Sequence, residues 1–280
     1  MASYGPAVIG NSVILNVLRC YLRQTDLATL CLVQRDTWRQ LVVQLYKEPQ
    51  LHNMKMLENL ANVVGAALPL QLGPHQCYGD FVHSLDLSMI PDRWSLVNGD
   101  DIEPIFNYCD HMQSINMNLC LNIEDVKFQN LFDKNPSLCE SLTSLDVSEL
   151  VAPAPVITHV LNVLPNLKSL TLSETKADDH LLAAVAKCMP NLEWLEINRC
   201  YHITDAGIAL IAKGCPKLMY LAVNKCHGVR NADVIKQINA KGGWEDVTDS
   251  ESDYSYDDEP EWGSDLDEHD EDFEYEDYLY

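Results

Sequence analysis

Ten cysteines are the residues of this 280-residue chain best suited to chemistry. A cysteine thiolate ligates zinc, takes part in disulfide exchange or acts as a nucleophile. No two cysteines have the C-x-x-C spacing of a redox or zinc pair. Instead, seven of the ten keep fixed distances from apolar triplets. They lie three or four residues before one (Cys109, Cys139, Cys188, Cys215) or three after one (Cys120, Cys200, Cys226). Cysteine at repeated positions indicates small buried apolar residues, and free thiols in this number favour a reducing compartment, cytoplasm or nucleus.

Other catalytic arrangements are missing from the sequence. It contains no glycine-rich phosphate-binding loop, no G-x-S-x-G nucleophile motif and no H-E-x-x-H zinc motif. The nine histidines are scattered, and none recurs with Cys or Asp at the spacing of metal ligands. We therefore expect a protein that is not an enzyme, with no catalytic residues, no metal site and no cofactor.

Binding residues are easier to identify, because residues 188–228 contain one pattern twice. L-x-x-L-x-L-x-x-C begins at Leu192 and again at Leu218, an offset of 26 residues. In a strand of this pattern the leucines point into the core, and the residues between them line the open face of the sheet. Trp194 and Tyr220 hold equivalent positions on neighbouring strands about 4.8 Å apart, so their rings should touch.

Large exposed aromatic residues flanked by charged ones are typical of protein-binding hot spots. Earlier repeats have only Ser84, Ser114, Ser144 and Ser169 at the equivalent position. We therefore predict a substrate-binding surface made by the open-face residues of the last two repeats: Trp194, Glu196, Asn198, Met219, Tyr220 and Asn224. The alternative is that a C-terminal segment folds over the two rings and buries them.

The elements that position these residues are repeated strands. The middle apolar residue recurs at positions 85, 115, 145, 170, 195 and 221, in steps of 30, 30, 25, 25 and 26 residues. Such a period indicates leucine-rich repeats, each a short strand, a turn and a helix. Prolines should end the preceding helices, at Pro136, Pro165, Pro190 and Pro216. The sequence thus predicts an α/β fold, a leucine-rich-repeat solenoid of about six repeats over residues 81–240.

Helical segments precede the repeats. After a lead-in at residues 1–11, residues 12–50 have the apolar spacing of three short helices, with Thr25 as the expected cap of the second and Pro49 ending the third. Residues 51–80 are expected to form a linker helix and a Pro- and Gly-containing connection. The sequence therefore predicts a small helical head joined to the repeats.

The charge of −23 is concentrated at one end of the chain. Residues 245–280 hold 18 of the 42 acidic residues and no Lys or Arg, so the rest carries 24 acids against 19 bases. We expect residues 241–280 to be a disordered acidic tail. Without a basic stripe we expect no nucleic-acid partner. The most apolar run, Leu60 to Leu72, is too short to span a bilayer, so we expect no membrane partner.

The head and the repeats together resemble a known family, the F-box and leucine-rich-repeat proteins. Residues 12–50 resemble a degenerate F-box, with Tyr21-Leu22, Asp26-Leu27, Leu32-Val33 and Trp38, although Asn11-Ser12 stands where an F-box usually opens with Leu-Pro. The repeat from Cys200 to Pro216 is similar to the cysteine-containing repeats of that family.

The resemblance implies a substrate-recognition adaptor of a Skp–cullin–F-box ubiquitin ligase. Its head would bind a Skp-type subunit and thereby the cullin ligase, and the open face of the repeats would hold a protein substrate. The implied contacts with the Skp-type subunit are apolar: Ile14, Val17, Leu18, Leu22, Leu27, Leu32, Val33 and Trp38. The alternative function is a leucine-rich-repeat scaffold whose acidic tail binds basic, histone-like nuclear proteins.

Overall fold

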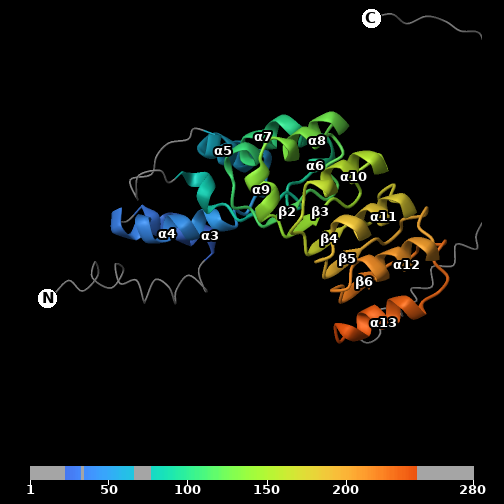
Figure 1. The fold of residues 1–280 in the computed structure, drawn as a ribbon. Helices are drawn as coiled ribbons and strands as arrows, with labels where there is room; N and C mark the ends of the chain where they lie inside the picture. Colours follow the sequence, from blue (N-terminus) through green and yellow to red (C-terminus); the bar gives the residue numbers. More distant parts are fainter. Residues whose placement is uncertain (1–22, 33–34, 66–76, 245–280) are drawn as a thin grey trace, which may run out of the picture. The chain divides into compact units, whose positions relative to one another are not determined.

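The computed structural model of the protein describes residues 23–32, 35–65 and 77–244. Within them, six strands form one parallel sheet whose order follows the chain (Figure 1). The strands are β1 (Ser84–Asp86), β2 (Ser114–Asn116), β3 (Ser144–Asp146), β4 (Ser169–Thr171), β5 (Trp194–Glu196) and β6 (Tyr220–Ala222). Their middle residues are those predicted from the apolar spacing, which confirms the repeat period.

The strands pair in strict register, which aligns equivalent residues in rows across the sheet. Ser84 pairs with Ser114, and the row continues through Ser144 and Ser169 to Trp194 and Tyr220. In β1 to β5 the middle residue is buried and the two outer residues are half-buried, as the alternation predicts. Ala222 of β6 is an exception: the alternation predicts it on the open face, but it is only 4% exposed.

Helices pack in a row against the sheet and against one another. The row runs from α5 (Met54–Gly65) through α7 (Gly99–Tyr108), α8 (Asp125–Asp133), α10 (Ala154–Asn162), α11 (Asp179–Cys188) and α12 (Asp205–Gly214) to α13 (Asp233–Lys241). Each buries one apolar face in a single continuous core, which also contains the strand leucines. The predicted α/β class, with helices connecting parallel strands, is therefore confirmed.

Two additional short helices explain the longer steps of 30 residues. Helix α6 (Arg93–Leu96) lies between β1 and β2, and α9 (Pro136–Ser141) lies between β2 and β3. Pro136 is the first residue of α9, where its missing N–H needs no partner, and the Asn135 side chain caps the same helix end. The preceding helix α8 ends at Asp133, three residues before Pro136, as predicted, and Pro136 in addition begins the next helix. Pro165, Pro190 and Pro216 likewise follow the ends of α10, α11 and α12.

Most of the repeat-locked cysteines are buried. The six are Cys109, Cys120, Cys139, Cys200, Cys215 and Cys226, whereas Cys188 is half-buried. Their position has a further use: the Cys200 thiol donates to Leu172 O at 3.2 Å, and Cys226 makes the equivalent bond to Ile197 O at 3.0 Å. Cysteine here thus fills core space and also satisfies a carbonyl of the preceding repeat.

The described part of the head consists of α3 (Gln24–Cys31), α4 (Arg35–Lys47) and the turn that follows. Helix α3 begins one residue before Thr25, so the prediction of Thr25 as its cap was wrong; Asp26 instead accepts from the Arg23 N–H at 3.1 Å. The end of α4 two residues before Pro49 agrees with the prediction. Residues 1–22 and 245–280, including the predicted first helix and the acidic tail, lie outside the described residues.

The Gln24 side chain ties the head to the start of the repeats. Its amide nitrogen donates to Leu45 O at 2.9 Å, and its oxygen accepts from the Gln50 N–H at 2.9 Å. Gln50 in turn forms a parallel bridge with Asp86 of β1. Helix α5 then packs on α7, so residues 50–65 lie against the start of the repeats.

Candidate protein-binding surface

The last two strands place Trp194 and Tyr220 on the open face, opposite the buried pair Leu195 and Leu221. Their rings stack with centroids 3.6 Å apart and an interplanar angle of 15°. Both side chains are half-buried. The predicted contact between the rings is present, and it follows from the register of β5 and β6.

The indole of Trp194 is held in place by its own strand. Its Nε1–H donates to Glu196 Oε1 at 2.8 Å, from a residue two positions along on the same face. Burial raises the pKa of the Tyr220 phenol, and the nearby charge of Glu196 raises it further. Tyr220 is therefore a neutral hydroxyl at physiological pH, and the only charge within this group of three side chains is the Glu196 carboxylate.

Trp244 contacts the stacked pair from the C-terminal side. The spacing of the repeats did not predict this contact. Its ring meets Trp194 and Tyr220 edge to face, at 5.5 Å and 87° and at 5.5 Å and 74°. Equal distances from two stacked rings mean that Trp244 lies beside the stack rather than on an outer face. Part of the alternative expectation is thus correct: a C-terminal residue, Trp244, contacts both rings from the side.

The Trp244 contact depends on a close backbone approach. Its N–H donates to Asn239 O at 2.9 Å, and a Cβ added at Gly242 would lie 2.4 Å from Met219 O. Only glycine fits there. Trp244 remains 45% exposed and Met219 remains 42% exposed, so the cluster presents apolar surface to solvent.

The two predicted asparagines have a different role. Asn198 Oδ1 accepts from the Asn224 N–H at 2.8 Å, and the Asn198 N–H donates to Ser173 Oγ at 3.1 Å. These bonds link the turns of successive repeats. Trp194, Glu196 and Tyr220 therefore lie together, and the exposed Met219 precedes Tyr220 in the chain. Asn198 and Asn224 instead lie at the ends of the strands and support the turns.

The predicted contacts with a Skp-type subunit are only partly described. Ile14, Val17, Leu18, Leu22 and Val33 lie outside the described residues; Trp38 lies in α4, but its side chain is not described. Leu27 is 6% exposed and packs on Leu41 of α4, so it serves the core of the head rather than its surface. Leu32, at the turn after α3, is 87% exposed. Among the described members of this set, Leu32 alone presents an apolar side chain to solvent.

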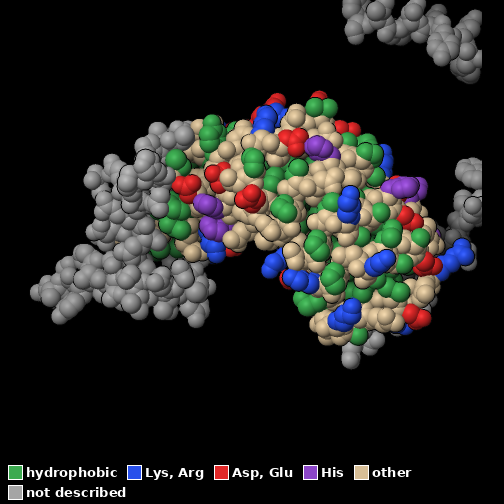
Figure 2. Space-filling model, in the orientation of Figure 1, with side chains coloured by type: hydrophobic (Ala, Val, Ile, Leu, Met, Phe, Trp, Pro, Cys, Tyr) green, Lys and Arg blue, Asp and Glu red, His purple; other side chains and the backbone are tan. Residues whose placement is uncertain are grey.

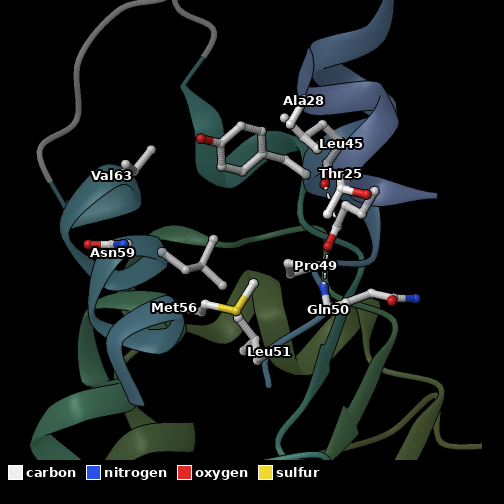
Figure 3. Close-up of a pocket in the computed structure, with 12 residues that line it drawn as sticks. Thr25, Ala28, Leu45, Pro49, Gln50, Leu51, Met56, Asn59 and Val63 are labelled. Carbon is white, nitrogen blue, oxygen red and sulfur yellow. Dashed lines mark hydrogen bonds between the residues drawn. The ribbon is translucent and has the colours of Figure 1, made fainter. Parts of the chain in front are cut away.

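A cavity of about 440 Å³ separates the head from the first helix of the row. Figure 3 shows Thr25, Ala28 and Leu45 on one side and Met56, Asn59 and Val63 of α5 on the other. Of its twelve described lining residues, Tyr46 is the only one that ionises, and burial raises its pKa. This cavity contains no pair of groups for acid–base or nucleophilic chemistry.

The surface chemistry of the described residues is mixed. Figure 2 shows one face, on which Lys and Arg side chains are interspersed with Asp and Glu rather than forming a continuous stripe. Across the described part of the chain, no cluster of three or more His, Cys, Asp or Glu residues is arranged to hold a metal ion. Every helix described is too short or too polar to cross a bilayer.

Comparison with known proteins gives only distant structural likenesses. No protein-family model matches the chain, and no curated protein matches it. Solved structures that resemble it include the Rad7–Elc1 complex of yeast (18% identity, TM-score 0.40, 71% of this chain), internalin inlF of Listeria monocytogenes (18%, 0.35, 68%) and the TLR13–ssRNA13 complex (15%, 0.32, 52%). The chain spans 62%, 61% and 21% of those chains, respectively.

Proposed function

We propose that the protein is a leucine-rich-repeat solenoid that binds other proteins, with an F-box-like head that makes it a substrate adaptor of a Skp–cullin–F-box ubiquitin ligase. The observation that carries the binding function is the stacked, half-buried pair Trp194 and Tyr220, with Met219 exposed beside it. Rigid aromatic residues lose little conformational entropy on binding and bury much apolar area, which is why they dominate interface energetics.

The adaptor role is supported by the head. Leu32 exposes nearly all of its apolar side chain at the turn after α3, where the F-box resemblance implies a contact with a Skp-type subunit. Docking such a residue in an apolar pocket contributes about 1.5–3 kcal/mol. The head is also fixed to the repeats, since Lys47 O accepts from the His83 N–H at 2.8 Å next to β1.

In this role the chain supplies no chemical step. It holds a substrate near the ligase and raises the local concentration of the substrate there. The described cysteines are free thiols, which supports a reducing compartment, cytoplasm or nucleus, as the place where the protein works.

The alternative function is a scaffold whose acidic tail binds basic, histone-like nuclear proteins. It is motivated by the 18 acidic residues in residues 245–280. In that case the head would have no role, and changes at Leu32 or Trp194 would leave the binding of basic proteins unchanged.

Point variants test the adaptor proposal better than removal of residues 1–50, because that deletion would also remove Gln50 from the edge of β1. We expect Leu32→Asp to weaken co-purification of a Skp-type subunit with the full chain about tenfold or more. Val151→Asp is the matched control, since Val151 is 55% exposed in the repeats. Equal recovery of the Skp-type subunit with wild type, Leu32→Asp and Val151→Asp would reject the adaptor role.

A further inference from the structure

A row of small side chains leads across the open face of the sheet to Trp194. Ser84, Ser114, Ser144 and Ser169 are half-buried and in register. Since parallel strands lie about 4.8 Å apart, the four serines span roughly 14 Å, the length of about four residues of extended peptide. The large indole follows directly after Ser169, so it stands as a wall at the end of this row of small side chains, which we call the trough.

Among the described residues, no aromatic ring contacts the face of Trp194 that points away from Tyr220. Tyr220 covers the face of the indole toward β6, and Trp244 lies beside the stack. The opposite face of Trp194 points along the row toward β4, where its register partner is the small Ser169. An occupant of the trough would therefore meet the flat face of an aromatic ring.

Some of the described charged side chains beside the trough form ion pairs, and Glu196 does not. Lys168 pairs with Glu193 at 3.6 Å, and Arg199 pairs with Glu174 at 3.0 Å, so these two cations are already neutralised. Within the described residues, the Glu196 carboxylate has no cationic partner and receives only the indole N–H.

Further along the row of Glu196, two more carboxylates border the trough. Asp86 and Asp146 each accept one backbone N–H at 2.9 Å, from Ser88 and Ser148. The open face thus has an excess of carboxylates next to an aromatic wall.

We propose that this face binds an extended, basic segment of the substrate, and that an arginine side chain of that segment stacks on the face of Trp194 toward β4 while its guanidinium bonds to Glu196. This inference rests on the proposed function of the open face and specifies the chemistry of its occupant. Glu196 Oε1 already accepts from Trp194, so the carboxylate is fixed beside the ring, and Oε2 is the oxygen available to a cation.

Arginine fits this arrangement better than lysine. Its guanidinium is planar and weakly hydrated, so it stacks on an indole face while its N–H groups bond to a carboxylate at the side. Bonds between ionised groups are also roughly twice as strong as neutral ones. An acidic segment would instead meet Glu196, Asp146 and Asp86 with repulsion.

The test uses the full chain and two small probes, Nα-acetyl-arginine amide and its uncharged isostere Nα-acetyl-citrulline amide. The readout is the indole N–H resonance of Trp194 in an NMR titration, assigned with Trp194→Phe. The acidic tail is the same in every variant, so cation binding there gives the same background in all titrations. The variant is Glu196→Gln, which keeps an acceptor for the indole N–H. The matched control is Glu140→Gln, at an exposed position of α9.

We expect the arginine probe to shift the resonance saturably, with an affinity about tenfold above that of the citrulline probe. Glu196→Gln should reduce the arginine affinity to that of citrulline, whereas Glu140→Gln should leave it unchanged. Equal responses to the two probes, or an unchanged response in Glu196→Gln, would overturn the inference. That result would leave the adaptor proposal intact, because Leu32→Asp tests the latter on other residues with another partner.

Discussion

The side chain of Asn239 pairs with both backbone groups of Leu221, as a further strand would. The Leu221 N–H donates to Asn239 Oδ1 at 2.8 Å, and Asn239 Nδ2 donates to Leu221 O at 3.1 Å. Asn239 is 4% exposed and lies in α13, so it closes the free edge of β6. An open edge with unpaired N–H and C=O groups would otherwise invite association with another chain.

This pairing predicts that truncating the Asn239 side chain strongly lowers the free energy of unfolding. Asn239→Ala leaves the buried N–H and C=O of Leu221 unpaired, which should lower the free energy of unfolding by about 2–3 kcal/mol. Urea unfolding followed by circular dichroism measures the loss. Gln237→Ala, an exposed change on the same helix, should stay within about 0.5 kcal/mol of wild type. A similar small loss for Asn239→Ala would mean that α13 does not complete the sheet.

The turns after the strands predict a stabilising change. Five residues, each four positions after the middle residue of its strand, have a positive φ of 55–62°: Leu119, Glu149, Glu174, Arg199 and Lys225. None is glycine, although this conformation costs other residues about 1–2 kcal/mol. Lys225→Gly should therefore raise the free energy of unfolding by about 0.5–1 kcal/mol, after the entropy of glycine in the unfolded chain is subtracted.

The control for this change is the same substitution in a helix. Lys236→Gly in α13 should lower the free energy of unfolding by about 1 kcal/mol, because glycine is a poor helix former. Parallel urea titrations of the two variants give the comparison. If both substitutions change the free energy of unfolding in the same direction, the turn at Lys225 does not carry the inferred strain.

The buried thiols predict a loss of stability at high pH. Burial raises the pKa of Cys109 and of Cys120 to about 12, against about 8.5 for a cysteine in an unfolded chain. A folded pKa above the unfolded one means that the stabilising contribution is complete below about pH 8.5 and is lost as the pH rises toward 12. The free energy of unfolding should therefore fall from about pH 9 upward.

Cys109→Ala isolates this contribution, because it removes one titrating thiol. The variant should have a lower free energy of unfolding than wild type at pH 7. The difference between the two free energies should become smaller as the pH approaches 11. Chemical unfolding at several pH values gives both curves. Parallel curves for the variant and wild type would show that the Cys109 thiol does not titrate with unfolding.

The repeat period predicted most of the fold, because repeats with apolar residues at constant spacing can stack in few ways. It placed all six middle residues and the contact between Trp194 and Tyr220. It did not predict α6 and α9, since short helices of four and six residues have no clear apolar period. Nor did it predict Asn239 or Trp244, whose roles depend on how the C-terminal turn meets β6, a tertiary contact without a sequence pattern. The roles predicted for the head and the tail remain predictions.

We infer that the open face at β5 and β6 binds a protein partner. In the double variant Trp194→Ala with Tyr220→Ala, the lost stacking should lower the free energy of unfolding by only about 1 kcal/mol, since both rings are half-buried and neither belongs to the core of the repeats. The double variant Trp194→Phe with Tyr220→Phe keeps an aromatic ring at each position and is the matched control.

Quantitative affinity purification of the full chain compares these variants, with the Skp-type subunit as internal reference. We expect the alanine double variant to fold, to retain the Skp-type subunit and to lose another bound protein about tenfold or more. The phenylalanine variant should recover that protein. If the alanine variant unfolds, the rings belong to the core; if it retains every partner, the open face is not the binding surface. Either result would contradict the account.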